Sequence, residues 1–427
     1  MKPKELIDKL KNGALNEEFS VLYGSDADTL EEQRQRYICA VKRFAELYPG
    51  RDDVHLFSAP GRSEIGGNHT DHQHGCALAA AVNLDAVAVV AFHDDGVIRL
   101  KSEGHGMCEA DLSDLSVQDE EKGSSVSMIR GIAARFTEMG AHIGGFDAYS
   151  VSDVLSGSGL SSSAAFETLV GTIIDTQHND GKAGAIEIAK IGQYAENVYF
   201  GKGSGLLDQM VCSVGGFVFL DFRDTDDPVV KKHSFDFEAA GYSLCITDTK
   251  GSHSDLTDDY ISVPAEMKEV AEYFGKPYLR EVDEEAFFSA IPELHGKVSD
   301  RAILRAIHFF GENRRAIQEA DALEGGDLER FFELYRQSAD SSANLLQNLY
   351  STKKPLEQGI PLALAVSRAL LGYDSNARVH GGGFAGTIQA FVPLDKTEAY
   401  RERMDALFGK GSCYVLRIRP VGGIRIL

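Results

Sequence analysis

Residues 156–167 read Ser-Gly-Ser-Gly-Leu-Ser-Ser-Ser-Ala-Ala-Phe-Glu, a glycine and serine run that passes directly into good helix formers. Gly157 and Gly159 let the backbone take left-handed angles and approach a ligand closely, while free N–H groups at the start of the helix point toward an anion. The preceding residues, 146–155, alternate as a strand does. Strand, glycine loop and helix in this order predict a phosphate-binding loop. The alternative is an ordinary serine-capped helix after a tight turn.

This loop matches neither of the two common nucleotide fingerprints. It has no Gly-Lys-Ser/Thr and is therefore not a Walker A loop, and its glycine spacing is not that of a dinucleotide-binding motif. Residues elsewhere in the chain must therefore decide between a ligand site and a simple helix cap.

Length, cysteine content and charge limit the number of domains, the cellular compartment and the partners that we expect. The chain has 427 residues, which exceeds the usual single domain, so we expect two. Its six cysteines form no CxxC pair, and we find neither a signal-like apolar segment nor a membrane-spanning run. We therefore expect a cytoplasmic, soluble protein, a monomer or small homo-oligomer. The formal net charge of −22 and the pI of about 5.0 disfavour nucleic-acid and anionic-membrane partners, so any nucleotide must be held locally.

Helical and strand patterns alternate in both halves of the chain, which predicts an α+β fold. A long apolar run at 77–92 ends in His-Asp-Asp-Gly and restarts at 97–100, which indicates a hairpin. The polar turn cluster at 224–228 is the best place for a domain crossing. We expect an N-terminal domain at 1–228 and a C-terminal domain at 229–427.

A polar segment at 58–75 is expected to form a loop between two apolar strands. It carries seven residues that could contact a ligand: Arg62, Glu64, Asn68, His69, Asp71, His72 and His74. Such polar density on a loop suggests a ligand site, although polar loops are also common at ordinary surfaces. A zinc site on the three histidines is a further alternative, but the spacing matches no dedicated metal motif.

Two carboxylates flank a glycine break at 201–205. Glu196 lies near the end of one helix, and Asp208 follows the break in Gly-Leu-Leu-Asp-Gln. A divalent cation on ATP phosphates needs one or two protein oxygens, which Glu196 and Ser163 could supply. Asp208 near Arg62 would stay ionised and could take a proton from an attacking hydroxyl. The alternative is that both acids are surface residues, as acids mostly are.

A third glycine run, Ala377-Arg-Val-His-Gly-Gly-Gly-Phe-Ala-Gly386, precedes an apolar strand. It could be a simple turn, but three polar glycine loops at strand ends in one chain are hard to explain by packing alone.

Together these segments resemble the GHMP kinases, and within them the galactokinases, in order and over nearly the whole chain. Residues 62–75 resemble the galactokinase pattern Gly-Arg-x-Asn-x-Ile-Gly-Glu-His-Thr-Asp-Tyr, 157–165 the ATP loop, and 378–386 the third motif. Residues 205–209 resemble the stretch with the catalytic aspartate. Tyr260 occupies the position of a sugar-contacting tyrosine. The resemblance implies a two-domain GHMP-kinase-like fold with the active site in the inter-domain cleft, and ATP and Mg²⁺ as cofactors.

The resemblance also implies roles for individual residues. Asp208 would be the base toward the anomeric hydroxyl of galactose, with Arg62 beside it, and Ser163 and Glu196 would hold Mg²⁺. The phosphate cradle would comprise Gly157, Ser158, Gly159, Leu160, Ser161, Ser162 and Ser163. The sugar contacts would be Glu64, Asn68, His69, Asp71, Gly205 and Tyr260.

The chain departs from the galactokinase pattern in its sugar segment. Glu64 and Asn68 stand where the family has Asn and Glu, and His72 replaces Tyr. An amide can donate as well as accept hydrogen bonds, so hydroxyl selection could shift. Residues 344–360 also lack the family's Asp-Tyr-x-Val-Ser. The prediction is therefore a galactose 1-kinase. The alternatives are a kinase for an N-acetylhexosamine, a uronic acid or arabinose, or a non-catalytic sugar and ATP sensor.

Overall fold

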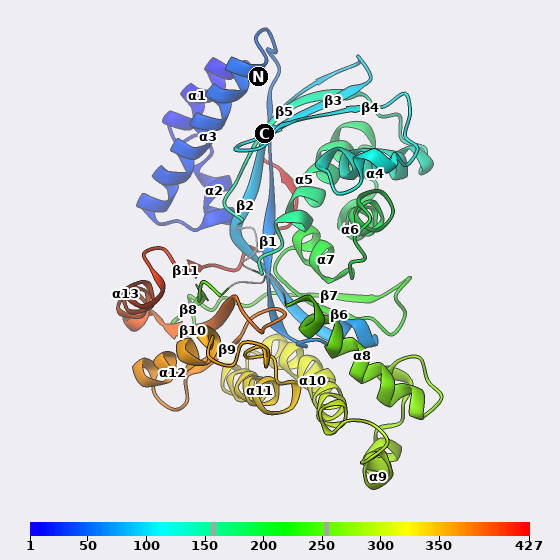
Figure 1. Cartoon of the computed structure of the whole chain (residues 1–427). Helices are drawn as coiled ribbons and strands as arrows, with labels where there is room; N and C mark the ends of the chain where they lie inside the picture. Colours follow the sequence, from blue (N-terminus) through cyan, green and yellow to red (C-terminus); the bar gives the residue numbers. More distant parts are fainter. Residues whose placement is uncertain (155–158, 252–255) are drawn as a thin grey trace.

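The computed structural model describes residues 1–154, 159–251 and 256–427, and helices and strands alternate along it (Figure 1). The α+β class expected from the sequence is confirmed. Two sheets organise the chain, one in each half, and most helices pack on their faces.

The larger sheet has eight strands in the order β12-β1-β2-β5-β3-β4, with β6 paired to β2 and β7 paired to β6. Its strands are β1 (His55–Gly66), β2 (Cys76–His93), β3 (Val97–Ser102), β4 (Met107–Asp111), β5 (Gly145–Ser152), β6 (Phe217–Asp221), β7 (Val229–His233) and β12 (Ile424–Arg425). The long strands β1 and β2 run from this sheet toward the second half of the molecule (Figure 1).

Helices cover both faces of the larger sheet. One face carries α1 (Pro3–Lys11), α2 (Asn16–Tyr23) and α3 (Ala27–Leu47), and the other carries α4 (Ser125–Glu138), α5 (Ser162–His178), α6 (Gly184–Tyr194) and α7 (Leu207–Val214) (Figure 1). Alternate residues of β2 serve the two faces: Val87 and Val89 join the core under α1 to α3, whereas Ala88 and Val90 join the core under α4 and α5. This double burial explains why 77–92 is an uninterrupted apolar run.

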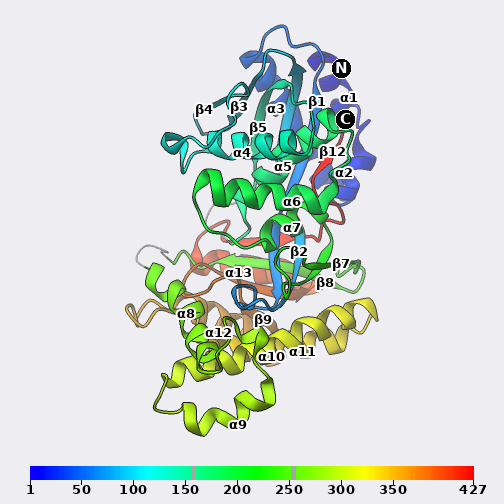
Figure 2. The same ribbon diagram turned by 90° about the vertical axis from the view of Figure 1, so that its right-hand side faces the viewer.

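The second sheet has the order β11-β8-β10-β9, and all its neighbours are antiparallel. Its strands are β8 (Tyr242–Asp248), β9 (Asn376–Val379), β10 (Thr387–Pro393) and β11 (Cys413–Leu416). The helices of this half are α8 (Thr257–Tyr273), α9 (Glu284–Leu294), α10 (Asp300–Glu324), α11 (Leu328–Ser341), α12 (Gly359–Leu371) and α13 (Thr397–Phe408) (Figure 2). Short helical turns are η1 (Asp71–Gln73), η2 (Asp119–Glu121), η3 (Ala195–Phe200), η4 (Leu279–Glu281), η5 (Ser342–Leu346) and η6 (Leu394–Lys396).

One hydrophobic core joins the two halves. It contains Phe57 of β1 together with Ile246 of β8, Tyr335 of α11 and Phe391 of β10. The chain end also returns to the first half, because β12 pairs with β1. The domain boundary near residue 228 stays a prediction.

The predicted hairpin of 77–92 with 97–100 is wrong. β2 and β3 do not pair, because β5 lies between them, antiparallel to β2 and parallel to β3. The connection from β2 to β3 crosses the start of β5 at Gly145, where a Cβ would lie 2.4 Å from the carbonyl oxygen of Val97. A glycine there lets the two backbones cross, and this long-range pairing left no local trace in the sequence.

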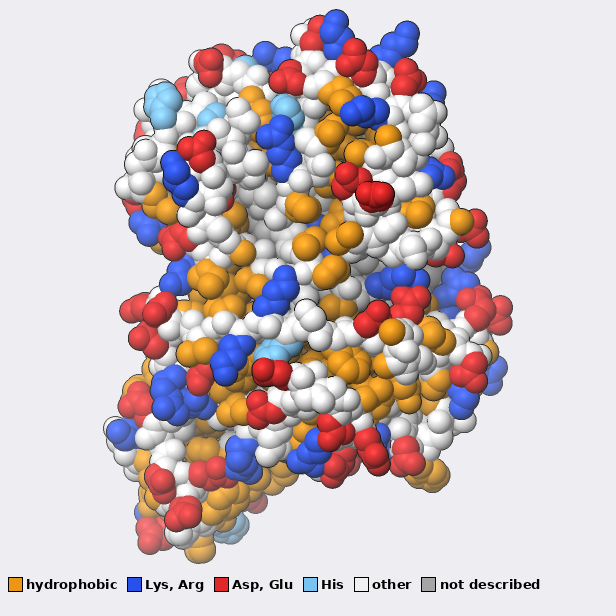
Figure 3. All heavy atoms as spheres, turned by 180° about the vertical axis from the view of Figure 1, so that it is seen from behind, with side chains coloured by type: hydrophobic (Ala, Val, Ile, Leu, Met, Phe, Trp, Pro, Cys, Tyr) orange, Lys and Arg blue, Asp and Glu red, His pale blue; other side chains and the backbone are white. Residues whose placement is uncertain are grey.

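The surface is mixed in charge. Figure 3, from behind, shows acidic and basic side chains interspersed over that face, with apolar patches between them. Within the described ranges, none of the helices is both long enough and apolar enough to cross a membrane.

Candidate active site

The three glycine-rich segments of the sequence meet in the structure. The backbone N–H of Arg62, at the start of the first segment, donates to Leu160 O of the second at 3.1 Å. His380 of the third segment lies 3.0 Å from the Ser63 hydroxyl, and its Nδ1 would lie 3.1 Å from a Cβ at Gly159. Residues as far apart in sequence as Ser63 and His380, 317 positions, therefore form one site between the two halves of the chain.

Arg62 and Asp208 form its charged centre. The predicted polar loop begins later than expected, because Arg62 and Glu64 lie on β1, which extends to Gly66. The strand directs Arg62 to Asp208, in the first turn of α7. Both guanidinium contacts, Nε to Oδ1 and Nη2 to Oδ2, are 2.7 Å. This bidentate geometry is the strong form of an arginine and carboxylate pair.

Asp208 is held in its ionised form. Burial alone would raise the pKa of its carboxyl, but the charge and hydrogen bonds of Arg62, together with a hydrogen bond from Ser161, outweigh burial and lower that pKa. The side chain of Asp208 still exposes 33% of its surface. A charged carboxylate with an open side is suited to receive a proton from a substrate hydroxyl.

The phosphate loop connects directly to this pair. Ser161 has a left-handed backbone (φ 57°) just before α5, and its hydroxyl donates to Asp208. Arg62 also donates to the carbonyl of Gly159. Gly157 and Ser158 lie outside the described residues. Leu160 is buried, and Ser162 and Ser163 are the first two residues of α5.

A carboxylate network lies beside the loop. Glu196 is in the π-helical turn η3 that follows α6, and its Oε1 is 2.8 Å from the ammonium of Lys202. The amide of Gln209 donates to Glu196 Oε2 at 2.9 Å and to Glu167 Oε2 at 3.0 Å. Burial and the charge of Glu196 raise the pKa of Glu167 well above its ordinary value. A cationic group, the ammonium of Lys202, thus already faces Glu196.

The loop after β1 carries further predicted sugar residues. His69 has a left-handed backbone (φ 58°), and its Nε2 is 2.9 Å from Gly382 O. The Asp71 carboxylate lies next to Gly205. A Cβ atom added to Gly205 would be 3.2 Å from Asp71 Oδ2. The Tyr260 hydroxyl donates to Gly383 O at 2.9 Å. His69 and Tyr260 therefore meet at the third glycine segment, Asp71 lies next to Gly205, and the role of all four residues as sugar contacts stays a prediction.

Glu64 and Asn68 have a different environment from the other predicted sugar residues. Asn68 is fully buried, and its side-chain nitrogen donates to Glu64 Oε1 at 2.8 Å. Arg378 also donates to Glu64 Oε1, at 3.1 Å. Burial raises the pKa of Glu64 to about 7 in spite of the Arg378 charge. The Asn68 amide and Glu64 Oε1 are bonded to the protein, and contact of either residue with a sugar stays a prediction.

The three histidines of this loop do not converge. The rings of His69 and His72 are 5.7 Å apart, while the His74 ring stacks on Tyr278 at 3.6 Å. Burial lowers the pKa of His72 to about 4, so this side chain is neutral. Over the residues that the structure describes, no group of three or more His, Cys, Asp or Glu residues is arranged to hold a metal ion. The zinc interpretation gains no support.

Sequence reasoning missed several residues of this region. Gln209 was next to Asp208, and Arg378 opened the third glycine segment, so both were visible as polar neighbours of motif residues. Glu312 and His308 had no such signal, because they lie in the long helix α10, outside all three glycine-rich segments.

Comparisons with known proteins identify the relatives of this chain. A family model for the galactokinase galactose-binding signature matches residues 42–92, and one for the GHMP kinase N-terminal domain matches residues 127–216. These ranges contain Arg62 and Asp208, respectively. A galactokinase of Streptomyces coelicolor is 31% identical over 384 residues, which are 88% of this chain and 94% of that protein.

Solved structures support the same relationship. The crystal structure of Lactococcus lactis galactokinase complexed with galactose matches with a TM-score of 0.74 and 26% identity, covering 90% of this chain and 98% of that one. The mevalonate kinase of Methanococcus jannaschii matches with a TM-score of 0.57 and 14% identity, covering 87% and 99%. The latter likeness is one of fold alone. The resemblance identified from the sequence motifs is confirmed.

Proposed function

Because this chain belongs to the galactokinase family of the GHMP kinases, we propose that it transfers the γ-phosphoryl group of ATP directly to the anomeric hydroxyl of galactose. The family makes it a sugar kinase, a phosphotransferase that uses ATP. The single observation that carries the finer proposal is the pair of Arg62 and ionised Asp208 beside Ser161 of the phosphate loop. The product is galactose 1-phosphate, with no covalent enzyme intermediate.

Asp208 acts as the base in this proposal. The anomeric hydroxyl gives its proton to the Asp208 carboxylate, its oxygen forms a bond to the γ-phosphorus, and the bond from that phosphorus to the β,γ-bridging oxygen breaks to release ADP. Phosphoryl transfer depends mostly on positioning and charge stabilisation, so a carboxylate of lowered pKa is sufficient. Arg62 keeps Asp208 ionised and adds positive charge next to the transferred group.

The phosphates would lie against the start of α5. The described part of the cradle is Gly159 to Ser163, and we propose the same role for Gly157 and Ser158. Exposed N–H groups at a helix start bind phosphate without a lysine.

We assign Mg²⁺ to Glu196 and Ser163. The ammonium of Lys202 at 2.8 Å from Glu196 supports this assignment, since that carboxylate already takes a cationic partner. Mg²⁺ prefers one or two protein oxygens together with phosphate oxygens and water. The metal would neutralise charge on the phosphates.

The sugar would occupy the region bounded by His69, Asp71, Gly205 and Tyr260. Glu64 and Asn68 belong to the same loop and the strand before it. Their departure from the family pattern keeps a related sugar as the second candidate substrate. A sensor without catalysis is disfavoured, since it needs no ionised base.

ADP release with Mg-ATP, measured over a panel of galactose, its epimers, N-acetylhexosamines, uronic acids and arabinose, tests the proposal. We expect turnover of galactose, and Asp208→Asn should reduce kcat by about 10²- to 10⁴-fold while galactose still binds. Asp147→Asn is the matched control, because Asp147 also pairs with an arginine, Arg51, but lies near the far end of β2.

The other outcomes are equally informative. No turnover of any sugar would exclude the kinase reaction and favour the sensor. Turnover of another sugar but not galactose would correct the substrate. Near-normal kcat in Asp208→Asn would remove Asp208 from its role.

A further inference from the structure

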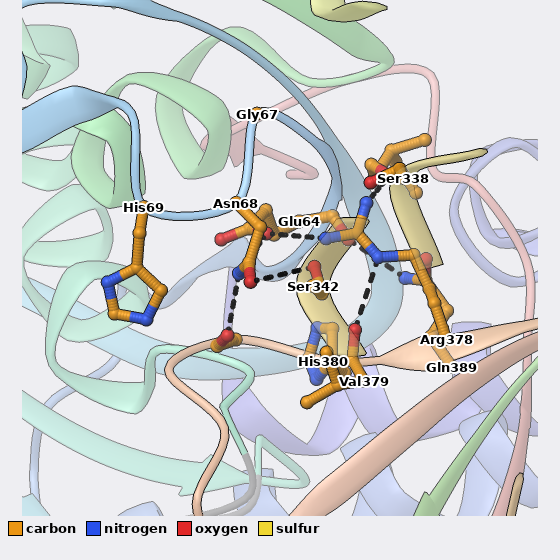
Figure 4. Close-up of polar contacts among 12 residues, drawn as sticks. Glu64, Gly67, Asn68, His69, Ser338, Ser342, Arg378, Val379, His380 and Gln389 are labelled. Atoms are coloured by element: carbon orange, nitrogen blue, oxygen red, sulfur yellow. Dashed lines mark hydrogen bonds and ion pairs between the residues drawn. The ribbon is translucent and has the colours of Figure 1, made fainter. Parts of the chain in front are cut away.

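Asn68 is the point at which five separate segments of the chain are tied together. Its side-chain nitrogen donates to Glu64 Oε1 on β1 and to Gly381 O in the third glycine segment, both at 2.8 Å. Its side-chain oxygen accepts from Ser342 of η5 at 3.4 Å (Figure 4). The same oxygen accepts from Asn348 at 3.0 Å. Both donor hydrogens and the acceptor oxygen of the amide are therefore engaged by protein.

The backbone of Asn68 is held as firmly as its side chain. Its N–H donates to Glu312 Oε1 at 3.3 Å, and the Gly67 N–H donates to the same oxygen at 3.2 Å. Its carbonyl oxygen is 2.9 Å from His308 Nε2. Glu312 and His308 both belong to α10 and are fully buried. Helix α10, in the second half of the chain, therefore holds this loop in place.

Glu64 extends this junction toward the third glycine segment. Arg378 is 1% exposed and donates both to Glu64 Oε1 and, at 2.7 Å, to Ile65 O. Figure 4 shows Glu64, Asn68 and Arg378 clustered together, with the His69 ring on the other side of the loop, away from Arg378. The residues next along the chain from Asn68, rather than Asn68 itself, are therefore free to face a ligand.

We propose that Asn68 and Glu64 are positioning residues for the sugar site, which fix the loop that presents His69 and Asp71, and that Asn68 does not contact the sugar. This inference rests on the proposed function and deepens it. The family pattern has Asn and Glu at these two positions, and this chain has Glu and Asn. In this chain the exchanged amide and carboxylate are in direct contact, and the amide of Asn68 is fully used by protein partners.

A cycle of nearly isosteric variants tests the proposal. Asn68→Asp replaces two N–H donors by a charged oxygen that faces Glu64 Oε1 and Gly381 O, whereas Glu64→Gln keeps an acceptor for Asn68. In the double variant, the new amide at 64 can donate to the new carboxylate at 68. We expect the KM for galactose to rise at least 10-fold in Asn68→Asp and less than 3-fold in Glu64→Gln. The KM for galactose of the double variant should be at least 3-fold lower than that of Asn68→Asp.

A positioning role predicts a selective effect. The KM for ATP should change less than 2-fold in all three variants, and thermal melting should confirm that each is folded. Asn344→Asp is the matched control, since Asn344 is exposed on η5 and its amide donates only to Asp340 O in this structure. If Asn68→Asp does not fold, Asn348→Asp carries the test, because it disturbs Asn68 Oδ1 from the other side.

Several results would overturn the proposal. One is an unchanged galactose KM in Asn68→Asp. Another is a double variant whose increase in galactose KM is no smaller than the product of the two single increases. A third is a lower galactose KM in Asn68→Glu, which would make position 68 a sugar contact. Failure of the proposed function is distinguishable, because it shows in wild type as absent galactose turnover. If wild type turns over another sugar instead, the KM for that sugar is measured in the same set of variants.

Discussion

Arg62 and Asp208 are joined by two parallel hydrogen bonds of equal length, 2.7 Å each, between a strand of the sheet and the first turn of a helix. Neither partner is free to move independently, since β1 holds Arg62 and α7 holds Asp208. The pair therefore fixes both the position and the charge of the proposed base.

Removal of Arg62 should change the pH dependence of catalysis. In wild type the pKa of Asp208 lies below its usual value, so the base stays ionised at every pH above about 5 and the acidic limb of kcat/KM lies below that pH. In Arg62→Gln, burial dominates and the pKa of Asp208 rises. We expect the acidic limb to move up by at least one pH unit and kcat at pH 7 to fall at least 10-fold.

Steady-state rates between pH 4.5 and 9 provide the measurement. Arg280→Gln is a suitable control, because Arg280 pairs with Asp221 in a similar 2.8 Å contact outside the Arg62 and Asp208 pair. An acidic limb in Arg62→Gln that coincides with that of wild type would show that Asp208 is not the group that titrates.

Metal dependence should separate Glu196 from Lys202. Glu196→Gln removes the negative charge that we assign to Mg²⁺, so the Mg²⁺ concentration for half-maximal activity should rise at least 10-fold. Lys202→Ala removes the cation that now faces Glu196 and should leave that concentration unchanged or lower it. Titration of Mn²⁺ by electron paramagnetic resonance in the presence of ATP reports binding without turnover. Equal Mn²⁺ affinity in wild type and Glu196→Gln would remove Glu196 from the metal site.

Two glutamates on α10 should respond to pH in opposite directions. Glu312 and Glu319 are both fully buried. Burial would raise the pKa of Glu312, but Arg315, His308 and Arg378 lower it to about 2. Burial and the charge of Glu312 instead raise the pKa of Glu319 well above its ordinary value. Glu312 is therefore charged at pH 7, whereas Glu319 keeps its proton to a higher pH than an exposed glutamate does.

Glu312→Gln should destabilise the protein at pH 7 by about 3–5 kcal/mol, because it leaves buried arginines without their partner. Since the pKa of Glu312 is lower when folded, its contribution is complete above about pH 4.5 and is lost as pH falls toward 2. The difference from wild type should therefore shrink below pH 4.5. Urea unfolding from pH 3.5 to 9 measures this difference in the free energy of unfolding.

Glu319→Gln is the internal control for this pair. A protonated glutamic acid and a glutamine are nearly isosteric, so the free energy of unfolding of Glu319→Gln should match wild type within about 1 kcal/mol below about pH 4, where this glutamate is protonated in both the folded and the unfolded chain. Because the pKa of Glu319 is raised on folding, wild type loses stability as pH rises through that pKa, and Glu319→Gln should gain relative to it. Equal pH dependence of the two variants would contradict both assignments.

The sequence predicted what depends on local patterns. The glycine loop before α5, the break before Asp208 and the buried run of β2 were all readable from neighbouring residues. The pairing of β5 between β2 and β3 was not, because it depends on contacts about 50 residues apart. The burial of Asn68 was equally hidden, since its partners at 312 and 348 lie more than 240 positions away.

Gly66 is one departure from the family pattern whose physical reason only the structure supplies. The galactokinase pattern has isoleucine at this position. In this chain a Cβ at Gly66 would lie 1.7 Å from Glu319 Oε2, which is closer than any real contact allows. Glu319 therefore fills the space that a side chain at 66 would occupy, and the two positions must change together.

Gly66→Ala should consequently destabilise the protein by about 1–3 kcal/mol through overpacking against Glu319. Adding Glu319→Ala removes the clash, so the double variant should be at least 1 kcal/mol more stable than the sum of the single effects predicts. Urea unfolding of the four proteins measures this coupling. Gly106→Ala is the matched control, because a Cβ there meets no atom within 4 Å, and it should change stability by less than about 0.5 kcal/mol. Additive effects at 66 and 319 would show that the backbone of β1 relaxes around the new methyl group, and the steric link between the two positions would then fail.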